Sequence, residues 1–537
     1  MTLYSPKGYG FDEIYSSPQL TGTRLPTEIT FNIPQSPDKW IVGKNSYISI
    51  RLNITQTNEA GVQGNLSPIV NTGTRAVPTA ISIPFLSVNP AISFFNNASC
   101  YVDSNQISQI SELQQTNTLY RMLFESKSEQ TYVNSQNSIV PPNIDDVKTA
   151  VGAINEDYVS LAKIVGVDDD DPTATPATYA TTDFSKLFTK HMIWALKNQQ
   201  FNFDKYSENE ITMQVPLPMF YADEPFFVGS GKKLTLRFTV DPLYAHNLIQ
   251  IAGSPSVQAT GAGGVGGGNY QVTTLSYPFQ SGAAQNTNVI NVAVTDMRLY
   301  LSVAHLDKMN IPRSVTIYMK QFSPFVRPLL TGNNNSFTVD LKQYRRMSHI
   351  AICFVNKSNE AFHQSPCDFS GGFTSLNNAG ALQTTESYIN TNQINNLYQV
   401  YISFGGNKYP MNDYTLLTTT YGVSTNLARA WYEMIVGSDS LRDRSGSLID
   451  FKTWQASPIF LFKTFQSMET TNNTINVSIN CRSVIPNANG TTSQPSYTSN
   501  INAFILGLYD EVYSLVFDDQ YRVVTESLDA VPIGVNQ

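Results

Sequence analysis

The sequence predicts an all-β protein made of two antiparallel sandwiches, and three observations lead to this prediction. First, segments in which apolar and polar residues alternate recur along most of the 537 residues, and alternation places every second side chain on one face of a strand. Second, clusters of Asn, Gly, Pro, Ser and Asp separate these segments, as turns require. Third, helical periodicity is confined to three short segments, too few to cover a parallel sheet. Strands repeated over this length predict two sandwiches side by side rather than one.

The predicted strands lie in both halves of the chain. They cover residues 29–33, 47–54, 91–102, 210–215, 233–240, 291–303, 314–321, 336–341, 349–355, 397–404, 458–465, 474–480 and 503–508. The segment 233–240 is typical, because Leu234, Leu236 and Phe238 alternate with charged and hydroxyl side chains. One of its faces is expected to enter a sandwich core and the other to meet solvent or a neighbour. Gly405 and Gly406 tolerate the positive φ of a tight turn and predict a hairpin after the strand 397–404.

Three helices are predicted, over residues 110–124, 183–196 and 426–435, and Gly437 stands where a helix C-cap is expected. The apolar faces of the first two could lie on a membrane or pack on a sheet or a neighbouring subunit. Apart from three lysines on the second helix, their polar faces lack the Lys and Arg excess of an interfacial helix. Packing on a sheet or a neighbouring subunit is therefore favoured.

The domain organisation follows from where the strand rhythm is interrupted. The long stretches 125–182 and 252–289 are expected to be loop insertions with interaction roles. We expect an N-terminal arm over residues 1–25, a first sandwich over 26–308, a linker at 309–313 and a second sandwich over 314–537. No internal repeat is visible in the sequence.

The composition argues against two classes of protein. Charged residues make up 14% of the chain, below the roughly 25% of an average protein, but the hydrophobic fraction is 41% and the net charge only −8, so disorder is not expected. The 34 basic residues are scattered, whereas direct nucleic-acid binding depends on clustered Lys and Arg. The N-terminal segment lacks the features of a signal peptide, and no run of about 20 apolar residues occurs. A soluble protein made in the cytosol is expected.

Three short motifs have plainer explanations than the chemistry they resemble. Gly261, Gly263 and Gly266 match a dinucleotide-binding fingerprint but lack the preceding strand and the following helix. The four carboxylates at 168–171 lack the ligand spacing and turn glycine of a calcium-binding loop, so a solvated loop is favoured over an ion site. The segment 437–441 resembles an esterase nucleophile turn but follows a helix instead of preceding one.

The cysteines and histidines show no ligand spacing either. Buried free thiols are expected for the four cysteines, Cys100, Cys353, Cys367 and Cys481. A triad assembled in three dimensions stays open for the five histidines, His191, His246, His305, His349 and His363, as does a carboxylate pair for glycoside hydrolysis. The sequence flags neither, so no catalytic, cofactor-binding or metal-binding residue is predicted, no cofactor is expected, and the protein is not expected to be an enzyme.

Seven blocks, in order, resemble the double jelly-roll major capsid proteins of polinton-like viruses and virophages, relatives of adenovirus and tectivirus shell proteins. The ordered set carries the resemblance, and no single block is diagnostic. The blocks are residues 29–55, 215–242 with its Pro-Leu-Pro turn, 294–307, 345–356, 397–414 with its Gly-x-x-Tyr-Pro turn, the helix NLARAWYEMIVG, and the final INAFILGLYDEVYSLVFDD. The stretches 125–182 and 252–289 do not match the family pattern, so their roles stay open.

The resemblance implies two tandem eight-stranded jelly rolls and a structural function. Such a chain would form a pseudo-hexameric homotrimer that tiles the icosahedral shell of a double-stranded DNA virus. Its partners would be neighbouring capsomers, penton proteins and minor or cement capsid proteins, without direct sequence-specific nucleic-acid binding. Its location would be the virion, after synthesis in the host cytoplasm.

Two other classes would share the sequence bias. A glycan- or receptor-binding β-sandwich of a fibre or spike would remain a stable small oligomer and bind a sugar. A β-sandwich hydrolase would show turnover that one or two carboxylates support, but the sequence names no such residues.

Overall fold

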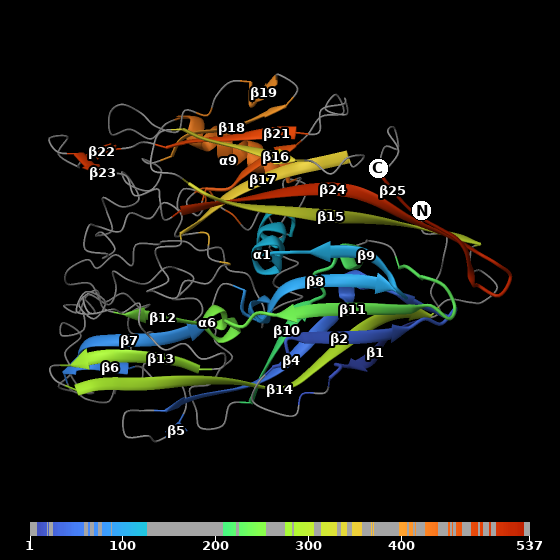
Figure 1. Cartoon of the computed structure of the whole chain (residues 1–537), viewed down its shortest axis with the longest axis horizontal. Helices are drawn as coiled ribbons and strands as arrows, with labels where there is room; N and C mark the ends of the chain where they lie inside the picture. The colour runs from blue at the N-terminus through green and yellow to red at the C-terminus, as the bar shows by residue number, and fades with distance from the viewer. Residues whose placement is uncertain are drawn as a thin grey trace.

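Two antiparallel sandwiches lie side by side in the computed structural model of the chain (Figure 1). The structure describes residues 8–18, 20, 25–57, 63–64, 69–73, 78–86, 89–125, 208–221, 225–253, 274–281, 284–305, 313–329, 334–340, 346–356, 367, 369, 397–404, 407–411, 414, 425–438, 449, 451, 454, 458–463, 474–481, 484–486, 493–495 and 501–530. The predicted helix 183–196 and nearly all of the expected insertion 125–182 lie outside these residues.

The first sandwich pairs two sheets, each with four principal strands. One sheet has the order β1 (Gly8–Tyr15), β14 (Ala284–His305), β4 (Tyr47–Thr57), β10 (Glu208–Gln214). The other has the order β2 (Glu28–Pro34), β11 (Lys233–Val240), β8 (Phe95–Val102), β9 (Asn105–Ile110). All of these pairings are antiparallel, as the sequence predicts.

The second sandwich is built in the same way from the C-terminal part of the chain. Its first sheet has the order β15 (Ser314–Pro328), β24 (Ile501–Phe517), β17 (Arg346–Asn356), β20 (Phe460–Lys463). Its other sheet has the order β16 (Asn334–Asp340), β21 (Thr474–Cys481), β18 (Leu397–Phe404), β19 (Asn407–Tyr409). The strands β18 and β19 pair through Phe404 and Asn407, which confirms the predicted hairpin.

Both sandwiches follow one connectivity. When the eight strands of each are numbered along the chain, the sheets read 1-8-3-6 and 2-7-4-5 in both. This is the order of a jelly roll, in which antiparallel strands fold over one another as two Greek keys. The chain is therefore a double jelly roll, and the fold class expected from the sequence is confirmed. The two sandwiches therefore repeat one strand order, although no internal repeat is visible in the sequence.

Further short strands extend the sheets. β3 (Lys39–Ile41), β5 (Gln63–Gly64) and β13 (Thr274–Ser281) join the first sheet, and β25 (Val523–Ala530) joins β24. Two small sheets form from β6 (Ile69–Gly73), β7 (Pro78–Leu86) and β12 (Ile249–Gly253), and from β22 (Val484–Pro486) and β23 (Ser493–Pro495).

Three sequence expectations need correction here. The expected loop 252–289 is partly strand, because β13 pairs along β14 from Ser281 to Thr274. The expected arm 1–25 contains β1, which pairs along its whole length with β14 and so belongs to the first sheet. The strand expected from residue 91 starts at Phe95, because Pro90, whose fixed φ suits a helix start, begins a 3-10 helix over Pro90–Phe94.

The helices differ from the predictions mainly at their ends. α1 covers Leu113–Phe124 and starts later than expected because Glu112 has a left-handed conformation, with φ 49°, between β9 and the helix. α9 covers Thr425–Gly437, so Gly437 is its last residue rather than a cap beyond it. A third helix, α6 (Tyr244–Leu248), was not predicted. Two further 3-10 helices cover Gly43–Asn45 and Pro218–Tyr221.

Alternating side chains build each core. In the first sandwich the ring of Phe238 lies 4.9 Å from that of Phe95 and 6.1 Å from that of Phe31, with all three buried. In the second, Trp454 packs edge-on against Phe460 at 5.6 Å. Each such side chain contributes roughly 1.5–3 kcal/mol through removal of apolar surface from water.

Candidate assembly surfaces

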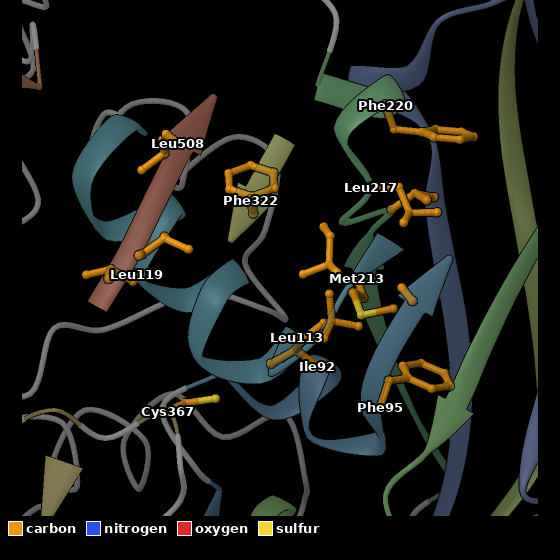
Figure 2. Packing of buried hydrophobic residues seen from close by; sticks show 14 of the residues in the cluster. Ile92, Phe95, Leu113, Leu119, Met213, Leu217, Phe220, Phe322, Cys367 and Leu508 are labelled. Carbon is orange, nitrogen blue, oxygen red and sulfur yellow. The ribbon is translucent and has the colours of Figure 1, made fainter. Parts of the chain in front are cut away.

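The helix α1 of the first sandwich packs against β15 and β17 of the second. The ring of Tyr120 is 5.2 Å from that of Phe322 on β15, and the ring of Phe124 is 5.6 Å from that of His349 on β17. Phe322 and His349 lie on the same side of this sheet, because both pair opposite Leu508 of β24. The apolar cluster at this contact includes Leu119, Phe322 and Leu508 (Figure 2).

The edge strand β9 forms a second part of the contact between the sandwiches. Gln321 is buried and its side-chain amide donates to the carbonyl of Ile107, at 3.1 Å. An edge strand presents unpaired backbone groups, which a covering element has to satisfy. Nearby, the ring of Phe227 lies 5.4 Å from that of Phe517, so aromatic packing continues along the contact.

Charged groups lie at the margin of the contact. The ammonium of Lys232 is 3.0 Å from the carboxylate of Asp103 and 3.9 Å from that of Glu526 on β25. Partial burial raises the pKa of Asp103, but the N–H of Lys233 and the charge of Lys232 lower it by more, so the net shift is downward. Burial raises the pKa of Tyr513, and its hydrogen bond to Glu526 adds to the rise.

The outer face of the first sandwich carries an exposed aromatic surface. We call it the aromatic face, and it consists of Tyr9, Phe11 and Tyr15 on β1 with Tyr47 on β4 and Tyr300 on β14. Tyr9, Phe11 and Tyr15 are 67%, 59% and 52% exposed. The rings of Tyr47 and Tyr300 stack at 5.1 Å, and that of Phe11 meets Tyr47 edge-on at 6.0 Å. Large apolar surface left in water marks interaction sites.

Charged side chains contact the aromatic face. The guanidinium of Arg298 lies 4.9 Å from the centre of the Tyr15 ring and forms ion pairs with Glu13 and Asp296. The hydrogen bond that Arg298 donates to Glu13 is the main cause of a raised pKa for Arg298, so this group keeps its charge.

The helix α9 also presents apolar residues to solvent. Tyr432 and Val436 are 55% and 44% exposed, and Ala428, one turn earlier, is exposed as well. Residues four apart lie on one side of a helix, so these three form one stripe, which we call the α9 face. The opposite side is buried through Ala430, Met434 and Ile435. Met411, just after β19, is 88% exposed.

Comparison with solved structures identifies the architecture. A chain in the cryo-EM structure of the Sputnik virophage matches with a TM-score of 0.53 and 10% identity, over 99% of this chain and 91% of that one. This chain has the fold of that virophage protein. The mavirus major capsid protein also matches, with a TM-score of 0.47 and 10% identity, over 97% of this chain and 90% of that one. No protein-family model matches the sequence, and no curated protein matches it.

The motifs weighed in the sequence fall mostly outside these surfaces. The glycines 261–266, the carboxylates 168–171 and His191 and His363 lie outside the described residues. Ser438 ends the last turn of α9, where its N–H donates to the carbonyl of Met434. His349 is buried, with Nε2 3.2 Å from the carbonyl oxygen of Gly437.

The described thiols and titratable groups show no assembled chemical site. Cys100, Cys353 and Cys367 are buried and are not part of a disulfide, as expected for them; the side chain of Cys481 is not among those described. Within the described ranges, no three His, Cys, Asp or Glu side chains are grouped so as to hold a metal ion. None of the described helices has the length and apolar character needed to cross a membrane.

Sequence reasoning missed the aromatic face. The signal was present in GYGFDEIY, where Tyr9, Phe11 and Tyr15 share one parity. Its pattern is inverted, because the aromatic side points outward while Gly10 and Asp12 point toward the core side. An alternation rule that assigns the apolar side to a core therefore gives no warning of an outward aromatic surface.

Proposed function

We propose that this chain is the major capsid protein of an icosahedral double-stranded DNA virus, of the virophage or polinton-like kind. One observation carries the proposal. The jelly roll occurs twice in one chain with identical strand order, and this architecture matches the Sputnik virophage chain over nearly all of both. The ordered sequence blocks described above support the same family.

The surfaces fit a structural role. The two sandwiches share a largely apolar contact through α1 and β9, so one chain supplies two similar lobes that pack on each other. Further apolar side chains are exposed on β1 and α9. Desolvation of charges at large interfaces is costly, and a chain with only 14% charged residues avoids much of that cost.

Assembly follows from this architecture. Three copies around a threefold axis would place six similar lobes in a ring, which is a pseudo-hexameric homotrimer. Its partners in the shell are neighbouring capsomers, with penton and minor or cement proteins at special positions. The protein is made in the host cytoplasm and resides in the virion.

The test is the assembly state of the purified full-length chain. Analytical ultracentrifugation should give a trimer mass, about three times 59.5 kDa, and negative-stain images should show particles with threefold symmetry and six lobes. A chain that stays monomeric at high concentration, or that forms a small oligomer without threefold symmetry and binds a glycan array, would overturn the proposal.

A further inference from the structure

His349 on β17 lies where a helix of each sandwich ends. Its ring is 5.6 Å from that of Phe124, the last residue of α1, and its Nε2 is 3.2 Å from the carbonyl oxygen of Gly437, the last residue of α9. The side chain is buried, at 8% exposure. One imidazole therefore contacts the C-terminal ends of two helices that belong to different sandwiches.

The neutral imidazole satisfies the contact with α9. A carbonyl oxygen only accepts hydrogen bonds, so Nε2 of His349 carries the hydrogen in this contact and donates it to Gly437. The imidazolium makes the same bond and differs by a second proton, on Nδ1. Protonation therefore charges a buried ring without adding a bond to α9, and burial of a charge is unfavourable.

Two cations near His349 also oppose a proton on its ring. Lys463 of β20 pairs opposite His349, so both lie on one side of the sheet, where like charges in opposite positions are destabilising. The ammonium of Lys320 on β15 is 5.6 Å from the centre of the Phe124 ring, and the same ring meets that of His349. An imidazolium would therefore be a third positive charge at this junction.

The other charged groups on the packed elements leave this balance in place. The helices carry ion pairs of 2.8 and 2.7 Å, Arg121 with Glu125 in α1 and Arg429 with Glu433 in α9. In the next row of the sheet, Asp510 of β24 pairs opposite Lys320 and Arg346, whereas Glu511 lies on the other side of that strand. The C-terminal end of α9 favours a positive charge, but this effect is modest. The junction as a whole disfavours the imidazolium.

We propose that His349 is a pH-sensitive coupling between the two sandwiches, neutral while α1 and α9 pack on it and charged once they separate from it. A histidine in water takes up its proton near pH 6.5, on the order of its ordinary pKa. Since the separated chain binds a proton that the packed junction resists, stability rises with pH and is lost as pH falls through this range. The contact should therefore be tight at neutral pH and weaken in mild acid. The inference concerns the chain itself and goes beyond the proposed shell function.

The experiment compares the pH dependence of stability in two variants of the full-length chain. His349→Gln places an amide N–H near the position of Nε2 and does not titrate. His305→Gln is the matched control, because His305 is partly exposed at the end of β14, where it pairs with Gly8 and Lys39. Urea titration at pH 7.5, 6.5 and 5.5 gives the unfolding equilibrium constant of each chain.

We expect the unfolding equilibrium constant of the wild type to rise in acid relative to that of His349→Gln. The limit for one proton is about tenfold for each pH unit below about 6.5, and His305→Gln should follow the wild type. Parallel profiles of the wild type and His349→Gln would mean that His349 has a structural role only and would overturn the proposal. So would a wild type that gains stability in acid relative to this variant.

Hydrogen exchange covers the case in which His349→Gln does not fold. In the wild type, residues 113–124 and 425–437 should lose protection between pH 7.5 and 5.5, after correction for the intrinsic exchange rate, whereas residues 233–240 of β11 should not. Equal changes in all three segments, or protection that persists in both helices, would contradict the inference. The assembly state tests the proposed function separately, so the two can fail independently.

Discussion

The two sandwiches have the same strand order, but the aromatic side chains on their first strands differ in exposure. In the second sandwich α1 packs against β15 at Phe322, and Phe322 and Leu508 are 4% and 0% exposed. In the first sandwich Tyr9 and Phe11 on β1 are 67% and 59% exposed. The inward residues set the topology of both, whereas the outward residues depend on what lies against them.

The two helices repeat this contrast. Each carries an Arg and a Glu four residues apart that form an ion pair, Arg121 with Glu125 in α1 and Arg429 with Glu433 in α9. The side chains are 1% and 16% exposed in the first pair but 36% and 38% in the second. The same Arg–Glu pair is therefore largely buried in α1 and partly exposed in α9.

The largest effect is expected for thiol reactivity. Burial raises the pKa of Cys100 from 9.0 to about 12, which lowers its thiolate fraction about a thousandfold, and burial also raises that of Cys353. Both should resist alkylation at pH 8 and react together in urea, because the sandwiches share a core contact. Peptide mass spectrometry measures this. Earlier labelling of one would show that the sandwiches open independently.

The next effect concerns the covered face. Phe322→Ala removes a ring that packs on Tyr120 and Tyr221 and should lower the free energy of unfolding by about 3–5 kcal/mol. Tyr318→Ala is the control, since Tyr318 lies on the same side of β15 but is 45% exposed, and should change it by less than about 1 kcal/mol. Urea titration gives both values. Equal losses would mean that α1 does not cover the sheet as described.

A smaller difference in stability is expected between variants of the ion pairs in α1 and α9. Glu125→Gln leaves the buried charge of Arg121 without its carboxylate partner and should cost about 3 kcal/mol. Glu433→Gln keeps an acceptor for the hydroxyl of Tyr414 and weakens an exposed pair with Arg429, for less than about 1 kcal/mol. Denaturant titration of the two variants measures the difference. Similar costs would contradict the burial contrast.

The smallest effect is a dependence on pH. The folded pKa of Asp103 lies below its ordinary value, so its contribution to stability is present above the unfolded pKa and is lost as pH falls through the folded one. Asp103→Asn should therefore cost under about 1 kcal/mol at pH 7, since the pair with Lys232 is partly exposed. The difference from the wild type should vanish in acid. A cost that persists at pH 2 would mean that charge is not the cause.

Strands with strong inward alternation were predictable from the sequence, and those without it were not. The segments 233–240 and 397–404 match β11 and β18 at both ends. β9 was missed because NQISQI is mostly polar. β1 was missed because its aromatic side faces outward. A strand at an edge needs fewer apolar residues, so its local signal is weak.

The sequence by itself determined the antiparallel β class and the inward faces of most strands, because alternation is a local property that each segment carries. Only the tertiary structure decided which strands pair, since Gly8 meets His305 and Ser314 meets Val516 across long stretches of chain. It also decided which aromatic side chains are covered. Burial of an outward residue depends on an element from elsewhere in the fold, and no local pattern encodes that neighbour.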